Sequence, residues 1–134
     1  MRMPRAPVLY AGERENLFEA PAGMIDAGES PETAMRREAV EEAGLGLGEL
    51  EPVATVWPSP GVSAERSSLF LAAYATADRT GAGGGLEGEH EAITVLELPL
   101  SELAAMADAG RLTDLKTLAL TFALRLRRPE LFAG

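Results

Sequence analysis

Three glutamates lie close together in residues 37–42, and their types and spacing suit metal chemistry. If this segment is helical, Glu38, Glu41 and Glu42 occupy positions i, i+3 and i+4 and share one face. Like charges at such spacings repel, at a cost of about 0.2–0.5 kcal/mol per pair on an exposed helix. Divalent cations would cancel that repulsion, and an all-oxygen ligand set suits Mg²⁺ or Mn²⁺. The segment is therefore a candidate metal site; the alternative is a solvated acidic face with neighbouring arginines as partial counter-charges.

The residues around this segment predict the helix that would position the carboxylates. Ser30 is a typical N-cap, and Pro31 suits the first helical position. The helix is expected to run to about Ala43, because Gly44 is a natural stop. The loop of residues 23–28 contains glycines, which let backbone carbonyls approach a bound ion. A loop followed by an acidic helix could thus hold a cation and, through it, a diphosphate.

The rest of the chain predicts short strands and helices in one compact domain, residues 1–134. The predicted strands are residues 8–10, 17–20, 50–57, 67–76 and 93–98, and the later helices are residues 101–109 and 113–128. Strands mixed with helices imply a sheet flanked by helices, an α+β arrangement. In the last helix, apolar side chains near helical spacing predict one buried stripe: Leu115, Leu118, Ala119, Phe122 and Leu126.

The composition limits the classes of partner. Twenty-one acidic against twelve basic residues give a net charge of −9, which repels nucleic-acid phosphates, so no nucleic-acid partner is expected. A phosphorylated small molecule would also be repelled unless cations intervene. The absence of cysteine excludes disulfides and thiolate metal sites and is compatible with a reducing cytoplasm, where we expect the protein to act. No apolar run reaches the ~18 residues of a membrane span, so no membrane partner is expected.

A longer pattern around the acidic helix resembles the Nudix box of the Nudix hydrolase family. Gly23 is followed after five residues by Glu29, and after seven more by the run from Arg37 to Leu45. The family pattern has a bulky aliphatic residue where this chain has Ala39. The resemblance implies a Nudix fold, which is an α/β/α sandwich with a mixed sheet. It also implies metal-dependent hydrolysis of a nucleoside diphosphate linked to a second group.

The same resemblance implies roles for individual residues. The implied ligands of Mg²⁺ or Mn²⁺ are Glu38, Glu41, Glu42 and the Ala22 carbonyl. The residues implied to hold the loop and the helix in place are Gly23, Glu29 and Arg37.

A glycine-rich loop before the strand at residues 93–98 holds the expected catalytic base. In similar enzymes a glutamate of this loop serves as base for the attacking water, and register against the strand makes Glu89 the first choice. Glu91 is the second carboxylate, which could contact a metal ion. The glycines indicate a loop that closes over substrate, and the alternative is a solvated acidic loop. His90, the only histidine, is interpreted as an exposed loop residue without a task.

Further positions are similar to the ADP-ribose pyrophosphatase subgroup. Residues 19–23 resemble the lead-in of that group, and Pro60 lies fifteen residues after Leu45, near the offset that marks it. Residues 112–117 also look like that group. The implied substrate-binding residues are Arg5, Glu19, Pro60, Gly61 and Glu65. The leading expectation is hydrolysis of ADP-ribose to AMP and ribose 5-phosphate.

Three other functions remain open. The enzyme could act on another nucleoside diphosphate sugar, because the box fixes the diphosphate chemistry and the loops fix the leaving group. The chain could be a Nudix module that senses a nucleotide without turnover, although the intact Glu38, Glu41 and Glu42 argue against it. A purely structural acidic domain would leave the spacing of the box unexplained.

A homodimer is expected from the resemblance and from apolar surface. Relatives in the ADP-ribose subgroup carry an N-terminal strand segment before the position of Arg5, often exchanged between two subunits. Here only residues 1–4 precede Arg5, so that segment is expected to be missing or shortened. The last helix and the strand at residues 50–57 are expected to expose apolar surface, which a two-fold dimer would bury.

Overall fold

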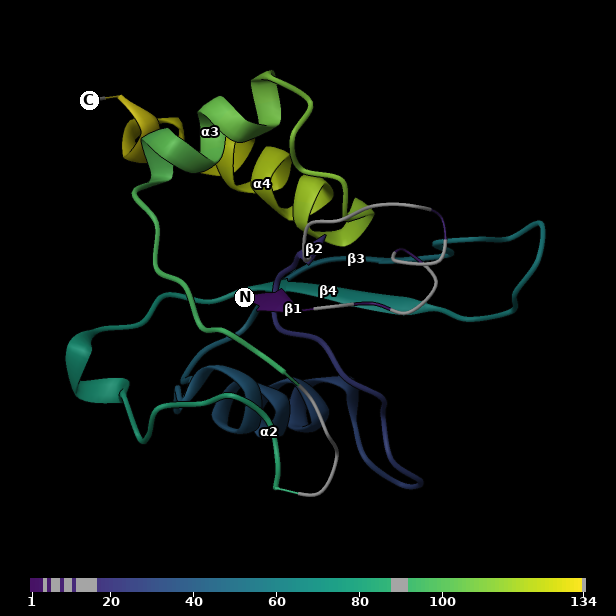
Figure 1. Cartoon of the computed structure of the whole chain (residues 1–134). Coiled ribbons are helices and arrows are strands. Elements are labelled where there is room, and N and C mark those ends of the chain that lie inside the picture. Colours follow the sequence, from purple (N-terminus) through teal and green to yellow (C-terminus); the bar gives the residue numbers. More distant parts are fainter. Residues whose placement is uncertain (4, 6–7, 9–10, 12–16, 88–91, 134) are drawn as a thin grey trace. The chain divides into compact units, whose positions relative to one another are not determined.

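A computed structural model of the chain describes residues 1–3, 5, 8, 11, 17–87 and 92–133 (Figure 1). The described helices and strands make a mixed α+β structure, in agreement with the expected class. They fold as two compact units. The first comprises Met1–Leu50 and Ala72–Leu96, and the second comprises Glu51–Leu71 and Glu97–Gly134. No helix in the described part of the chain is long and apolar enough to cross a membrane.

The first unit is built around helix α2 (Pro31–Ala43), which begins and ends where the sequence predicted. The Ser30 hydroxyl accepts a hydrogen bond from the Thr33 N–H at 3.2 Å and so caps the first turn. Gly44 ends the helix in the left-handed region, at a φ of 68°. The acidic face of α2 is therefore bounded at both ends by local signals.

Short strands and small side chains complete the first unit. Strand β1 (Arg2–Met3) pairs antiparallel with β2 (Leu17–Phe18), and a 3₁₀ turn, η1, covers Thr76–Asp78. Ala39, where the family pattern has a bulkier residue, is only 2% exposed. The buried apolar residues described in this unit are Met1, Met3, Ala34, Ala39 and Ala43.

The second unit contains a hairpin and the two later helices. Strands β3 (Glu51–Val56) and β4 (Ser67–Leu71) pair antiparallel, with a register shift after Pro52, which has no N–H to donate to a ladder. Helix α3 (Leu100–Asp108) contacts α4 (Leu115–Arg127), and a 3₁₀ turn, η2 (Pro129–Phe132), follows. At the end of α4, Arg127 and Arg128 both donate to the carboxylate of Glu51, at 2.7 and 2.9 Å.

Three strand predictions were wrong in extent, and a fourth falls mostly on residues that the structure does not describe. The predicted strand at 17–20 ends at Phe18. The predicted strand at 67–76 ends at Leu71, because the Asp78 carboxylate accepts the Ala75 N–H at 2.7 Å and favours a turn there. The predicted strand at 93–98 is reduced to one isolated bridge between Thr94 and Arg2. Val8 donates its N–H to the Arg5 carbonyl in a turn, while residues 9 and 10 lie outside the described residues. The described strands form two separate antiparallel pairs.

The predicted buried stripe of α4 was also wrong. Leu126 is 83% exposed, and Leu115 and Phe122 are exposed as well, whereas Thr117 and Thr121 are buried. The threonine hydroxyls can be buried because each has a partner in the helix or at its N-cap. Thr117 donates to Asp114 at 2.7 Å, and Thr121 donates to the Thr117 carbonyl at 2.8 Å.

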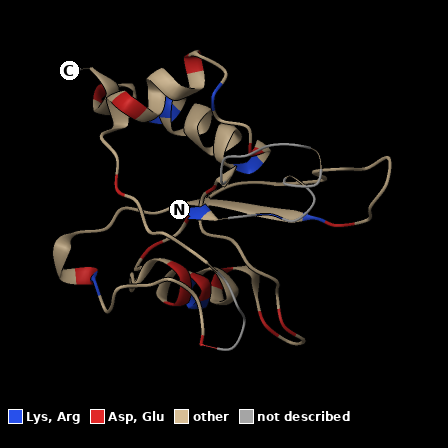
Figure 2. Ribbon diagram, in the orientation of Figure 1, with Lys and Arg blue, Asp and Glu red and all other residues tan. Residues whose placement is uncertain are grey.

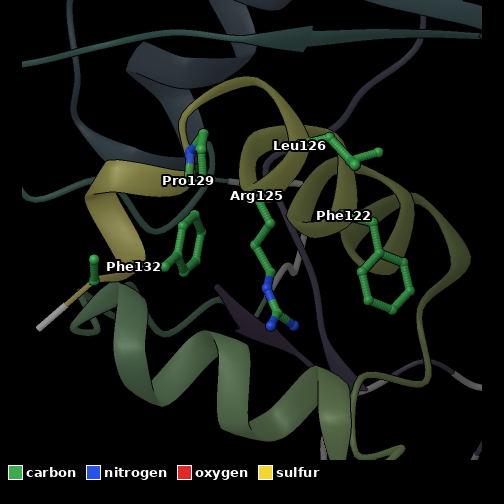
Figure 3. Close-up of a pocket in the computed structure, with 6 residues that line it drawn as sticks. Phe122, Arg125, Leu126, Pro129 and Phe132 are labelled. Carbon is green, nitrogen blue, oxygen red and sulfur yellow. The ribbon is translucent and has the colours of Figure 1, made fainter.

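The exposed apolar side chains of α4 line a hollow of about 590 Å³ with η2 (Figure 3). The Arg125 guanidinium lies 5.9 Å from the ring centroid of Phe132 and donates to Asp108 at 2.7 Å. The hollow is lined by Phe122, Arg125, Leu126, Pro129, Phe132 and Ala133. It belongs wholly to the second unit, whereas the acidic helix belongs to the first.

Candidate metal site

Acidic residues gather along α2, as Figure 2 shows, and Arg37 lies among them. One nitrogen of its guanidinium, Nη1, donates to Glu38 at 2.7 Å and to Glu41 at 3.2 Å. The other two nitrogens, Nε and Nη2, donate to the two carboxylate oxygens of Glu29 at 3.2 and 3.1 Å. Arg37 therefore joins the loop before the helix to the acidic face of the helix.

These contacts also shift the pKa values of Glu29 and Arg37, each in the direction that favours the charged form. The hydrogen bond from Arg37, with a second from the Asp26 N–H, holds the pKa of Glu29 below its usual value. The bonds to Glu29 and Glu38 raise the pKa of Arg37 further. Nη2 of Arg37 also donates to the Met24 carbonyl at 2.9 Å, which adds a backbone contact to the ion pairs. The loop is thus attached to the helix by a permanently charged group.

The third carboxylate, that of Glu42, is turned into the protein. Glu42 is only 3% exposed, and its Oε2 accepts the Ala22 N–H at 2.8 Å. Buried carboxylates need hydrogen-bond donors, and here the donor is the backbone of the loop before the box. The structure therefore brings Ala22 and Glu42 together. Whether the Ala22 carbonyl is a metal ligand remains a prediction.

Gly23 leaves room for Glu38, which occupies the space where a side chain would lie. A Cβ built on Gly23 would overlap the carboxylate and the Cγ of Glu38. With glycine at this position, the backbone of the loop lies against the acidic face while Glu38 keeps its place beside Arg37.

The candidate ligands are all oxygen donors, which suit a hard divalent cation. Three of the four candidate ligands are carboxylates and the fourth is the Ala22 carbonyl. The cation that faces Glu38 and Glu41 is the guanidinium of Arg37. In the part of the chain that the structure describes, no three acidic side chains are grouped as a metal ion would need. Glu38 and Glu41 would have to turn from Arg37 to become ligands, so their assignment remains a prediction.

Two of the predicted substrate-binding residues lie in contact in the first unit. Nε and Nη2 of Arg5 donate to the two carboxylate oxygens of Glu19 at 2.8 and 3.2 Å. Glu19 is only 3% exposed, while Arg5 is partly exposed. The sequence predicted both residues but not their pairing.

The other predicted residues do not lie in this cluster. Pro60, Gly61 and Glu65 are exposed in the segment between β3 and β4 of the second unit. Glu89 and Glu91, the expected base and second carboxylate, lie outside the described residues, as does His90. Their roles remain predictions.

A contact that the sequence did not predict lies at the C-terminal end of α2. The N–H groups of Gly84 and Gly85 donate to the carbonyls of Glu42 and Glu41, at 2.9 and 3.0 Å. From the sequence alone, the glycine-rich loop is expected to be flexible. The signal available in the sequence was the run itself, because consecutive glycines also mark the close approach of two backbones.

Comparison with known proteins identifies the family of the chain. The NUDIX domain matches residues 5–119, so the chain belongs to the Nudix family. Similar curated proteins are GDP-mannose pyrophosphatases. The one from Pectobacterium atrosepticum is 42% identical over 120 residues, which are 89% of this chain and 61% of that protein. Those from Citrobacter koseri and Escherichia coli O1:K1 are 42% and 41% identical over 108 residues, or 81% of this chain and 55% of theirs.

The names of these relatives differ from the expected subgroup. The positions around Pro60 predicted a likeness to ADP-ribose pyrophosphatases, whereas the relatives are named for GDP-mannose. The chain also spans only 55–61% of the length of these relatives. The family is therefore established more firmly than the substrate.

Proposed function

We propose that the protein is a metal-dependent pyrophosphatase of a nucleoside diphosphate sugar, with GDP-mannose as the first substrate to test. The observation that carries the proposal is that Glu38 and Glu41, on one helix, both accept from Arg37 beside a loop in which Gly23 leaves room for the Glu38 carboxylate. Membership of the Nudix family supports the reaction class, and the names of the relatives support the sugar nucleotide. For GDP-mannose, addition of water across the diphosphate would give GMP and mannose 1-phosphate.

The three glutamates would hold Mg²⁺ or Mn²⁺, with the Ala22 carbonyl as a further ligand. When bound, such an ion neutralises phosphate oxygens and lowers the pKa of a bound water. The chain itself holds the loop against the helix through Arg37 and Glu29. Because the net charge of the protein is −9, such cations would reduce its repulsion of a diphosphate.

Arg5 is the cation of this chain that we propose for the substrate. Nε and Nη2 of Arg5 both donate to the buried carboxylate of Glu19, and this restricts the direction of the guanidinium. A restricted guanidinium can donate to a phosphate or to a base edge without losing much further freedom. Pro60, Gly61 and Glu65 remain candidate contacts for the leaving group.

A substrate panel tests the proposal. GDP-mannose, ADP-ribose and UDP-glucose would each be incubated with the protein and Mg²⁺, and nucleoside monophosphates would be separated by chromatography. We expect GMP from GDP-mannose, and no product from Glu42→Gln. Glu49→Gln is the matched control, because Glu49 is an exposed glutamate of the same unit outside the acidic cluster.

Each outcome of the panel has a distinct meaning. A higher kcat/KM for ADP-ribose would replace GDP-mannose by the substrate that the spacing of Pro60 favours, within the same reaction class. Binding of a nucleotide sugar by calorimetry without turnover would support the sensing module instead. No binding and no turnover by folded protein would overturn the proposal.

Family membership also supports the single domain with an α/β/α sandwich that the sequence predicted, and these remain proposals for this chain. We also propose a homodimer. Its support is the apolar surface that α4 exposes at Leu115, Phe122 and Leu126.

A further inference from the structure

We propose that the glycine run Gly83–Gly85 is a positioning element for the carboxylates at the end of α2. This inference rests on the proposed function, because it concerns the residues expected to bind the metal ion. The run would act on Glu41 and Glu42 through their backbone and not by contact with the substrate. Its chemistry is hydrogen bonding to the carbonyls of these two residues.

The contacts of the run complete the last turn of α2. A helix leaves its last four carbonyls without partners in the helix. The carbonyls of Ala39 and Val40 accept from Leu45 and Gly44, each at 3.0 Å. Those of Glu42 and Glu41 accept from Gly84 and Gly85, at 2.9 and 3.0 Å. The carbonyls of Glu41 and Glu42 are therefore paired with a segment distant in sequence. Those of Ala39 and Val40 are paired with residues that directly follow the helix.

A second set of contacts holds the same segment from its other side. The Thr80 N–H donates to the Gly44 carbonyl at 2.8 Å, and the Gly46 N–H donates to the Asp78 carbonyl at 2.8 Å. Leu45 and Arg79 form an isolated bridge. The segment from Asp78 to Gly85 thus follows the end of α2 over several residues, and its glycine run lies beside the helix and is not free.

The run must be glycine to lie so close. All three residues have positive φ, at 69°, 107° and 90°. A Cβ on Gly83 would lie 2.5 Å from the Glu42 carbonyl oxygen and 2.9 Å from the Cα of Ala43. Gly44 faces the segment in the same way, because a Cβ there would overlap the Gly81 carbonyl. Glycine on both sides lets two backbones meet.

Electrostatics give the contact a role beyond packing. The carbonyl end of a helix carries about half a negative charge, which disfavours carboxylates nearby. The last turn of α2 contains Glu41 and Glu42 and no basic residue. The two N–H groups of the run offset part of this charge, together with those of Gly44 and Leu45. By fixing the carbonyls of these residues they also fix the direction of each Cα–Cβ bond, and so the point at which the carboxylates can meet a metal ion.

A matched pair of glycine variants separates positioning from folding. Gly83→Ala adds a methyl group against the end of α2 at a φ of 69°, whereas Gly110→Ala adds one at 67° with nothing within 4 Å. The backbone strain is alike in both. Dissociation constants for Mn²⁺ would be measured by calorimetry on folded protein, together with the midpoint of thermal unfolding. We expect Gly83→Ala to weaken Mn²⁺ binding at least tenfold and Gly110→Ala to change it less than twofold.

Equal Mn²⁺ affinity in the two variants would overturn the positioning role, even if Gly83→Ala were the less stable. Wild-type protein that binds no Mn²⁺ would instead overturn the proposed function, and the present inference with it. If Gly83→Ala does not fold, hydrogen exchange of the wild type decides the question. Saturating Mg²⁺ should slow exchange of the Gly84 and Gly85 amides at least tenfold, and exchange unchanged by Mg²⁺ would refute the inference.

Discussion

Replacing Gly23 by alanine should separate the stability of the protein from its activity. The new methyl group would overlap the Glu38 carboxylate and its Cγ, which are the flexible end of a side chain. Glu38 can therefore turn away at a cost of about 0.5–1.5 kcal/mol for a poorer rotamer. Gly23 has no positive φ, so alanine fits its backbone conformation. Alanine also lowers the conformational entropy of the unfolded chain, which stabilises the folded protein by about 0.4–1 kcal/mol. The free energy of unfolding should thus change by less than about 1 kcal/mol.

The loss of function should be much larger than this change in stability. When Glu38 turns away it leaves both the Arg37 contact at 2.7 Å and the position from which it is expected to bind the metal ion. Loss of even an outer-shell partner typically weakens a metal site about 10–100-fold, so loss of a ligand should cost at least that much. The midpoint of thermal unfolding, by contrast, should move by roughly 4 °C or less.

Gly48→Ala is the control for this experiment. Gly48 lies in the same unit, has no positive φ, and has open space where its Cβ would lie. Calorimetry with Mn²⁺, thermal unfolding and kcat/KM would be measured on all three proteins. The reasoning is refuted if Gly23→Ala binds Mn²⁺ as tightly as the wild type. A fall in the unfolding midpoint of more than about 10 °C would show that Glu38 is held rigidly and cannot move aside.

Three further predictions concern other parts of the chain. Asp114 caps α4, and although burial opposes the charged form, Lys116 and Thr117 hold its pKa below the usual 3.8. Its charge therefore stabilises the fold above about pH 4, and this contribution is lost as the pH falls through the folded pKa. Asp114→Ala should cost about 1–2 kcal/mol at pH 7 by urea unfolding. Asp114→Asn should keep most of the cap, and its deficit should shrink on acidification; a constant deficit would contradict the assignment. Glu89→Gln should lower kcat by about 10²–10⁴-fold with little change in substrate binding, as expected for a general base. The same loss in Glu91→Gln alone would show that the register is wrong by two residues. Light scattering over a dilution series should give the mass of a dimer, and a monomer mass at high micromolar concentration would exclude it.

The sequence predicted best the features that depend on neighbouring residues. The cap at Ser30 and the left-handed Gly44 act within one turn, so the bounds of α2 could be predicted to the residue. The turn at Gly110 and the two later helices were predicted for the same reason.

Features that depend on distant partners could not be predicted in this way. The strand expected at 93–98 has the right residue types, but pairing needs a neighbour, and only Thr94 bridges to Arg2. In α4 the hydrophobic spacing predicted burial of leucines, whereas buried hydroxyls with partners inside the helix took their place. The contact of the glycine run with α2 could not be predicted, because flexibility and close packing leave the same residues in a sequence.

Substrate recognition was the least predictable part of the site. The offset of Pro60 pointed to ADP-ribose, while the relatives are named for GDP-mannose. One proline at a given distance does not describe the pocket for a leaving group, since that depends on loop conformation. The pairing of Arg5 with Glu19 likewise needed the fold to bring together residues fourteen positions apart.

The contact between the glycine run and α2 also has a consequence during translation, because its two sides are synthesised at different times. A chain emerges from the ribosome N-terminus first, and a helix with its own caps can form as soon as it is free. The whole Nudix box is translated by Leu45, but Gly84 and Gly85, the donors for Glu42 and Glu41, come 39 and 40 residues after Leu45. A nascent or prematurely ended chain therefore carries every expected ligand without the amides that hold the last turn. If these amides position the ligands, the capacity to bind a metal ion should accordingly appear only after Gly85 has been translated.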